Sequence, residues 1–333
     1  MVTDDQTNSG TPGTEVSTSR RRLLQMMGAT GLAGIGTTGA VAADDADTTD
    51  TEALPIDSRD LEVAVMAAKQ AADIHDENAD AGVEADTKAP QQLVTEVDTS
   101  SETIIRDTIR DELGDDFEAD GYALFGEEEG GSLEGDRVWI IDPLDGTTNF
   151  ARGIPHYCVS IAVTRDSELY AGVIYYSPTD EVYVAVRGEG TYRYLGGEDG
   201  MPVSGTTTEL TVTSTETVEE SLNSVGFYSE AGIDDERYRE LMKTFVTDSL
   251  GIRQLGAAAV DLAFVAEGVF DTLTVKDLKE VDIAAGALLV EEAGGTVTDF
   301  EGNSSLEAIL AGDTVATNCE LHDELLELYN SAD

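Results

Sequence analysis

One stretch of the sequence decides the fold and the site of this chain: Trp139-Ile140-Ile141-Asp142-Pro143-Leu144-Asp145-Gly146-Thr147-Thr148-Asn149-Phe150. The apolar residues up to Ile141 predict a short buried strand, and Pro143 predicts a turn directly after it. Asp142 and Asp145 stand three residues apart around this turn, so both carboxylates can point at one spot. Oxygen ligands of that kind suit Mg²⁺ better than zinc. The stretch therefore predicts a strand that ends in a magnesium site.

The residues after Asp145 predict an anion site. Gly146 allows the backbone to come close to a bound group, and Thr147 and Thr148 predict the start of a helix, whose free N–H groups attract anions. A metal beside an anion site is what phosphoryl chemistry needs. The alternative is an Asx-type turn with a threonine N-cap, because Asp, Pro and Gly are common in turns. Taken alone, the segment favours this plain turn.

The composition describes a folded and very acidic protein. Of its 333 residues, 68 are acidic and 19 are basic, so the formal net charge is −49. Phosphate backbones would repel such a polyanion, and we expect no nucleic-acid polymer as a partner. Apolar residues make up 41% of the chain, which is too many for a disordered protein. Because the acidic residues are spread along the whole chain rather than gathered in one tail, we infer a halophilic protein.

The first 43 residues resemble a twin-arginine export signal. A basic run, Arg20-Arg21-Arg22, precedes a mildly apolar stretch rich in Gly and Ala, and Ala40-Val41-Ala42 fits a cleavage site. The alternatives are an unprocessed tail and an uncleaved anchor, although the glycines between Gly28 and Gly36 make a poor membrane helix. We expect an extracellular or cell-surface protein if the signal works and a cytoplasmic one otherwise. After processing we expect no stable membrane span.

The rest of the chain predicts an α/β protein in two layered parts. An acidic linker over 44–57 leads into a metal-binding subdomain over 58–205. A Gly-, Thr- and Ser-rich boundary at 196–209 separates it from a second α/β subdomain over 206–333. In the second subdomain we expect strands over 221–227 and 270–275, and helices over 235–246, 257–267, 282–293 and near 323–329.

Periodicity predicts the elements of the first subdomain. Apolar spacing indicates an amphipathic helix over 59–78 and a second helix over 102–113, capped by Ser100 or Ser101. Alternating apolar and polar residues over 157–195 indicate an antiparallel meander. We expect His75, near the end of the first helix, to be a surface or capping residue.

Four further segments place the metal segment in a larger pattern. Leu93-Val94-Thr95-Glu96-Val97-Asp98 and Gly126-Glu127-Glu128 precede it, and Asp282-Ile283-Ala284-Ala285-Gly286 and Glu291-Glu292-Ala293-Gly294-Gly295 follow it. In this order and spacing they resemble the inositol monophosphatase family of Mg²⁺-dependent, lithium-sensitive phosphatases, from about Asp60 to the C-terminus. The resemblance implies an αβαβα sandwich with a mostly antiparallel sheet in the first half and a mixed sheet in the second.

The resemblance also implies which residues hold metal ions. Glu127, Asp142 and the carbonyl oxygen of Leu144 would hold one Mg²⁺. Asp142, Asp145 and Asp282 would hold a second ion, and a third, weaker ion would lie near Glu127. Lithium would compete at the second position. Family members often dimerise, so we expect a homodimer.

Catalytic and substrate-binding roles follow from the same resemblance. Asp98 and Thr147 would form a pair that helps to activate a water held by the metal, together with Glu127. The phosphate would rest on the amides of Gly146 and Thr147. The positions that would bind the substrate are Asp145, Gly146, Thr147, Ala258 and Asp282.

The substrate side departs from the pattern of the animal inositol phosphatases. Val281 stands where they have Trp, and Val275 stands where they have a Glu that binds inositol hydroxyls. Lys276 and Lys279 either reach a second phosphate or pair with nearby acids. The predicted activity is hydrolysis of a sugar or inositol phosphate by metal-activated water, with His156 in a structural rather than a catalytic role. The alternatives are a fructose-1,6-bisphosphatase, a 3′(2′),5′-bisphosphate nucleotidase, and a non-enzymatic protein that binds metal or phosphate.

Overall fold

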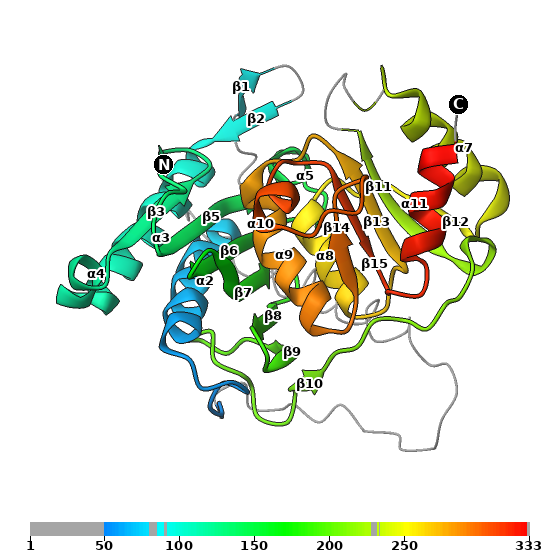
Figure 1. Ribbon diagram of the computed structural model, residues 1–333. Coiled ribbons are helices and arrows are strands. Elements are labelled where there is room, and N and C mark those ends of the chain that lie inside the picture. Colours follow the sequence, from blue (N-terminus) through cyan, green and yellow to red (C-terminus); the bar gives the residue numbers. More distant parts are fainter. Residues whose placement is uncertain (1–49, 80–84, 90–91, 228–231, 233, 332–333) are drawn as a thin grey trace, which may run out of the picture. The chain divides into compact units, whose positions relative to one another are not determined.

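The computed structural model describes residues 50–79, 85–89, 92–227, 232 and 234–331 (Figure 1). The predicted export segment lies outside these residues. Within them, one sheet of eight strands and one of five form the body of the fold, and β1 (Ala85–Ala89) and β2 (Gln92–Thr95) form a separate hairpin.

The first sheet has the strand order β10-β9-β8-β7-β6-β5-β3-β4. Every neighbouring pair is antiparallel except β3 and β5. The alternating residues over 157–195 form β6 to β9, so the predicted meander is confirmed. The bounds are β3 Tyr122–Gly126, β4 Gly130–Gly131, β5 Arg137–Asp145, β6 Cys158–Arg165, β7 Glu168–Tyr176, β8 Glu181–Val186, β9 Gly190–Leu195 and β10 Thr208–Glu209.

Helices cover both faces of this sheet. On one face, α2 (Arg59–Asn78) packs its small apolar residues, such as Ala68, beside α3 (Glu96–Leu113). On the other face lie α8 (Ala258–Ala266) and α9 (Glu280–Glu292). The residues of α9 are buried from Ile283 to Val290, because this helix is enclosed between the two sheets.

The second sheet is mixed, as predicted, with the order β12-β11-β13-β15-β14. Strand β11 runs parallel to β12 and β13, whereas β15 runs antiparallel to β13 and β14. Helices α7 (Glu236–Asp248) and α11 (His322–Ser331) pack on its outer face around Phe245, Phe300 and Tyr329. The strand bounds are β11 Leu222–Phe227, β12 Gly251–Arg253, β13 Thr272–Lys276, β14 Thr296–Thr298 and β15 Thr314–Thr317.

The layers therefore follow the predicted αβαβα order: α2 and α3, the first sheet, α8 and α9, the second sheet, α7 and α11. The shorter elements are α4 Asp115–Ala119, α5 Thr147–Ala151, η1 Val218–Glu220 and α10 Leu306–Ile309. The subdomain boundary after residue 205 stays a prediction; β10, which lies beyond it, still pairs with β9 of the first sheet. In the part of the chain that the structure describes, none of the helices is both long enough and apolar enough to cross a membrane.

Candidate active site

A bulge in β5 brings the first two carboxylates together. The predicted strand ends at Ile141, but β5 continues to Asp145. Asp142 pairs with Ser160 and Asp145 with Cys158, so three steps along β5 match two steps along β6. In a regular strand, residues three apart point to opposite faces, and the extra residue places both on the same face. The predicted turn at Pro143 is therefore a bulge within the strand, which is a position where proline is tolerated in a sheet.

Asp282 completes an acidic cluster with these two residues. One carboxylate oxygen each of Asp142, Asp145 and Asp282 lies within 4.8 Å of the others. Asp282 comes from the first turn of α9, where its Oδ2 accepts a hydrogen bond from the backbone N–H of Lys279 at 3.3 Å. Asp142 and Asp145 are buried. Residues of β5 in the first sheet and of helix α9 thus meet at one point.

Glu127 approaches the same cluster from the end of β3. Its backbone N–H donates to the carbonyl oxygen of Ile141 at 3.1 Å, which holds it beside the residue that precedes Asp142. Its Oε1 lies 2.6 Å from the ammonium nitrogen of Lys279. Of the two lysines left open by the sequence, Lys279 therefore lies at the acidic site.

The pKa values in this cluster are raised by burial and by like charge. Burial raises the pKa of Asp142 and Asp145 well above the usual range, and the neighbouring carboxylates of Glu127 and Asp282 raise them further. Burial, followed by the charge of Glu127, raises the pKa of Asp282 to about 6. Acids in such surroundings ionise together only when a cation balances their charge.

The donor set fits a magnesium ion. Carboxylate oxygens of Asp142, Asp145 and Asp282 converge, and Glu127 lies close enough for its charge to act on Asp142 and Asp282. Hard oxygen donors and an excess of negative charge are what Mg²⁺ prefers. The Asx turn weighed in the sequence is also present, since Oδ1 of Asp142 accepts from the N–H of Leu144 at 2.9 Å. This turn aims the side chain of Asp142 and does not compete with the cluster.

Asp98 and Thr147 form the predicted pair. The Oγ1 of Thr147 lies 2.8 Å from Oδ1 of Asp98 and 3.1 Å from the carbonyl oxygen of Leu144. The other oxygen of Asp98 accepts from the N–H and the hydroxyl of Thr95, at 2.8 and 2.6 Å. Burial raises the pKa of Asp98.

The start of α3 differs from the prediction, and the difference concerns the site. The helix begins at Glu96 with Thr95 as its N-cap, not near residue 102 with a serine cap. Thr95 and Asp98 form a capping box. The side chain of Thr95 accepts from the backbone of the first helical turn, and the side chain of Asp98 accepts from the backbone N–H of Thr95. Asp98 is therefore a helical residue whose second oxygen is occupied by the cap, which leaves the first one for Thr147.

Gly146 and α8 complete the rim of the site. Gly146 has φ 92°, and a Cβ at this position would come within 2.8 Å of the carbonyl oxygen of His156, so only glycine fits. Helix α5 starts directly after it, at Thr147, as predicted. Oδ2 of Asp145 accepts from the N–H of Ala259 at 2.7 Å, which anchors the first turn of α8 and with it Ala258.

His75 is buried and not at the surface, which corrects the prediction. Its side chain is 0% exposed, with Nε2 at 3.0 Å from the carbonyl oxygen of Pro143 and Nδ1 at 2.9 Å from the hydroxyl of Ser177. A carbonyl only accepts, so Nε2 carries the proton and Nδ1 accepts from Ser177. Burial lowers the pKa of His75 to about 4. His75 therefore supports the bulge of β5 through its hydrogen bond to Pro143.

The other predictions about single residues can also be followed. His156 lies 3.1 Å from Oδ1 of Asp261, whose other oxygen accepts from Ser224 at 2.6 Å, which is a structural network. Lys276 pairs with Asp313 at 2.7 Å and with Asp235 at 3.1 Å, next to the ring of Phe300. Lys276 is therefore the structural lysine of the two.

The two positions at which the sequence departs from the animal inositol phosphatases are buried and apolar. Val275 and Val281 are 1% and 2% exposed and belong to the core between the sheets. Neither side chain offers a hydrogen bond to a sugar hydroxyl.

Comparison with known proteins agrees with this geometry. The sequence model of the inositol monophosphatase family matches residues 57–332. The chain belongs to this family. It is 41% identical over 211 residues to the Nus factor SuhB of Pseudomonas aeruginosa, which covers 62% of this chain and 73% of that protein. It is 33% identical over 216 residues to the inositol-1-monophosphatase of Caulobacter vibrioides, which covers 64% and 79%.

Solved structures show the same fold. The extragenic suppressor protein suhB of Bartonella henselae superposes with a TM-score of 0.72 at 29% identity, over 83% of this chain and all of that one. The IMPase of Thermotoga maritima superposes with a TM-score of 0.69 at 28% identity, over 83% and 98%. The inositol monophosphatase family member described here is thus a phosphoric monoester hydrolase of a Mg²⁺-dependent family that acts on small phosphorylated substrates.

Two contacts at the site were not predicted: His75 bonds to the carbonyl oxygen of Pro143, and Glu102 binds the turn that contains Glu127. Both join residues far apart in the sequence. The contact of Lys279 with Glu127 agrees with the weighed alternative that this lysine pairs with a nearby acid. Only Glu102 left a signal: it follows Asp98 by four residues, and residues four apart share a helix face.

Proposed function

We propose that this protein hydrolyses an inositol or sugar phosphate monoester with the help of Mg²⁺. The observation that carries the proposal is the meeting of three buried or half-buried carboxylates within 4.8 Å of one another, beside the Thr147–Asp98 pair. Family membership supports phosphatase chemistry. The choice of inositol or sugar phosphate rests on relatives that are named inositol-1-monophosphatase.

We assign the metal positions to the chain's own oxygen donors. Glu127, Asp142 and the carbonyl oxygen of Leu144 would hold one Mg²⁺, and Asp142, Asp145 and Asp282 a second. A third, weaker position would lie near Glu127. When bound, Mg²⁺ lowers the pKa of a water molecule and offsets the charge that develops on phosphate oxygens.

The protein groups around the metals would position the reactants and move a proton. The hydroxyl of Thr147 donates to Asp98, which leaves its lone pairs to accept a proton from the attacking water. As that water oxygen attacks phosphorus and the bond to the ester oxygen breaks, the water proton would pass to Thr147 and the proton of Thr147 to Asp98. The ester oxygen would leave as an alkoxide and take a proton from solvent. The raised pKa of Asp98 suits this acceptor role. The amides of Gly146 and Thr147, at the start of α5, would hold the phosphate, and Ala258 would line the substrate side.

The substrate is tested by phosphate release from the full chain at molar KCl with Mg²⁺. Three compounds are compared: myo-inositol 1-phosphate, fructose 1,6-bisphosphate and adenosine 3′,5′-bisphosphate. A preference for the first supports the proposal. A preference for the second or the third moves the assignment to a fructose bisphosphatase or to a bisphosphate nucleotidase on the same scaffold. No release from any of them, with protein that is folded and binds Mg²⁺, contradicts it.

Lithium inhibition follows from the same assignment. Li⁺ would compete for the position formed by Asp142, Asp145 and Asp282. Raising the Li⁺ concentration at fixed Mg²⁺ should therefore lower phosphate release, and indifference to Li⁺ would argue for an altered second position.

We also propose that the protein is exported, halophilic and dimeric. Export rests on Arg20-Arg21-Arg22 and the cleavage-like Ala40-Val41-Ala42, and the test is the N-terminal residue of protein secreted by its source cells. Halophily rests on the net charge of −49, and the melting temperature should rise steeply with KCl. Dimerisation rests on the family resemblance and is tested by light scattering at high salt.

A further inference from the structure

The turn that contains Glu127 is short and closely surrounded. Strands β3 and β4 pair through Gly126 and Gly130, so Glu127, Glu128 and Glu129 form the connection between them. No metal or catalytic role is assigned to Glu128 and Glu129, yet the backbone N–H groups of both residues donate hydrogen bonds. The acceptors of these two N–H groups determine how rigidly the turn holds Glu127.

Both donors go to one buried carboxylate. Oε2 of Glu102 accepts from the N–H of Glu128 at 2.6 Å, and Oε1 accepts from the N–H of Glu129 at 3.1 Å. The side chain of Glu102 is 0% exposed. Burying a carboxylate is costly unless hydrogen bonds and an opposite charge compensate it. These two backbone bonds supply the first part of that compensation.

Arg106 supplies the opposite charge and binds the same turn. Its Nε donates to Oε1 of Glu102 at 2.8 Å, and one terminal nitrogen donates to the carbonyl oxygen of Gly130 at 2.6 Å. Arg106 is 6% exposed. The Glu102–Arg106 pair therefore binds three backbone groups at the turn: the N–H groups of Glu128 and Glu129 and the carbonyl oxygen of Gly130.

Gly126 leaves the room that the pair needs. A Cβ at this position would overlap the carboxylate of Glu102 and come within 2.7 Å of a terminal nitrogen of Arg106. The glycine before Glu127 is thus explained by the close approach of α3 to the backbone of the turn.

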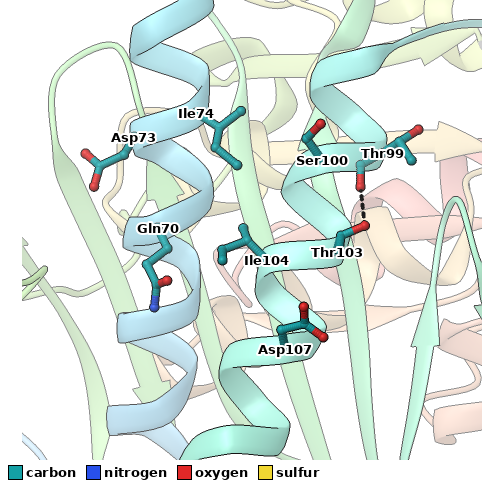
Figure 2. A pocket seen from close by; sticks show the side chains of 8 residues that line it. All are labelled: Gln70, Asp73, Ile74, Thr99, Ser100, Thr103, Ile104 and Asp107. Atoms are coloured by element: carbon teal, nitrogen blue, oxygen red, sulfur yellow. Dashed lines mark hydrogen bonds between the residues drawn. The ribbon is translucent and has the colours of Figure 1, made fainter.

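Asp98, Glu102 and Arg106 are four residues apart and share one face of α3. The opposite face lines a groove of about 510 Å³ against α2, where Thr103 donates to the carbonyl oxygen of Thr99 (Figure 2). On the inner face, Asp98 binds Thr147, and Glu102 and Arg106 bind the Glu127 turn. One helix therefore contacts both sides of the proposed site.

We propose that Glu102, backed by Arg106, is a positioning residue that holds Glu127 in place for the metal. This inference rests on the proposed function, in which Glu127 is a metal ligand. A ligand acts through its position, and groups that orient ligands typically change metal affinity 10- to 100-fold when they are removed. Glu102 touches neither metal nor substrate, so its effect should reach the reaction only through Glu127.

The test compares Mg²⁺ affinities of full-length variants by calorimetry at molar KCl, without substrate. Glu102→Gln keeps the shape of the side chain but removes the charge that faces Arg106 and replaces one acceptor oxygen with an NH2 group, which cannot accept from the turn. We expect its affinity for the first Mg²⁺ to fall about 10-fold. The Mg²⁺ concentration needed for half-maximal phosphate release should rise by the same factor, while kcat at saturating Mg²⁺ stays close to that of the parent.

Two controls separate positioning from general stability. Asp107→Asn removes a negative charge from the exposed side of α3 and should leave Mg²⁺ affinity unchanged. Glu267→Gln weakens another Arg–Glu pair, the one between Glu267 and Arg193. The carboxylate of Glu267 also accepts a hydrogen bond from Tyr183. We expect both Glu267→Gln and Glu102→Gln to lower the melting temperature in EDTA, but only Glu102→Gln to weaken Mg²⁺ binding.

A folded Glu102→Gln protein with the parent's Mg²⁺ affinity would overturn the proposal and leave Glu102 a purely structural residue. If that variant does not fold, Arg106→Lys, which keeps the charge but loses the bond to Gly130, is measured in its place and judged in the same way. A parent that binds Mg²⁺ but releases no phosphate contradicts the proposed function alone, because the affinities still test Glu102. A parent that binds no Mg²⁺ contradicts both.

Discussion

The two walls of the site differ in how they are built. The wall formed by β5 and α5, with Asp142, Asp145 and Thr147, is polar and tied at nearly every step to backbone or side-chain partners. The facing wall, from β13 into α9, presents Val275 and Val281 as core residues and contributes Asp282. The comparison teaches that the acidic cluster and the positions that differ from the animal phosphatases are separate: the cluster is complete, whereas Val275 and Val281 are buried in the core.

The largest effect is expected in the polar wall. Asp142→Asn exchanges a charged ligand proposed to be shared by both metals for a neutral one. Phosphate release should fall on the order of 10³-fold, the loss seen when a group that stabilises developing charge is removed. Circular dichroism should show an intact fold, and Asp107→Asn serves as the control. Normal turnover in Asp142→Asn would refute the two-metal assignment.

The facing wall is tested by removing its buried lysine. Lys276→Met leaves Asp235 and Asp313 without their ammonium partner, so the free energy of unfolding should fall by about 2 kcal/mol, less than for a fully buried pair because Asp313 is partly exposed. Denaturant unfolding at molar KCl measures this loss. Activity per folded molecule should not change. A variant of unchanged stability with a raised KM would instead place Lys276 at the substrate.

His75 tests the support beneath the polar wall through pH. Its folded-state pKa of about 4 lies below the value of 6.5 expected for an unfolded chain. Between pH 6.5 and 4 the imidazole is therefore protonated in the unfolded state but stays neutral in the folded state. The free energy of unfolding falls as the pH drops over this range, by up to about 1.4 kcal/mol per pH unit. His75→Gln lacks this contribution, so unfolding free energies of parent and variant should converge between pH 7 and 5. Parallel pH curves would contradict a buried neutral imidazole.

The smallest effect is expected where the two walls meet. Lys279 joins α9 to Glu127, and its positive charge opposes a metal ion nearby. Lys279→Gln should raise Mg²⁺ affinity a few-fold, on the order of 1 kcal/mol for a partly exposed charge. Lys243→Gln, at an exposed pair on α7, is the matched control. An unchanged affinity would show that Lys279 turns away from Glu127 when metal binds.

Much of the fold was predictable because its signals are local. Helix α2 occupies the predicted range 59–78, and the meander follows strict alternation, since both patterns repeat within a few residues. The start of α3 was predicted wrongly. Thr95 and Asp98 make a capping box, but Ser100 and Ser101 offered equally good caps to a reader of the sequence.

The sequence by itself determined the layered α/β class, the acidic character and which carboxylates belong together, because the motifs around Asp98, Glu127, Asp142 and Asp282 occur in a characteristic order. Only the tertiary structure decided how they meet. The bulge that turns Asp142 and Asp145 to one face depends on pairing with β6. Lys279 and Glu127 lie 152 residues apart along the chain, and the burial of His75 and Glu102 depends on packing against other elements. Local patterns specify periodicity, whereas contacts between distant segments arise only when the core closes around them.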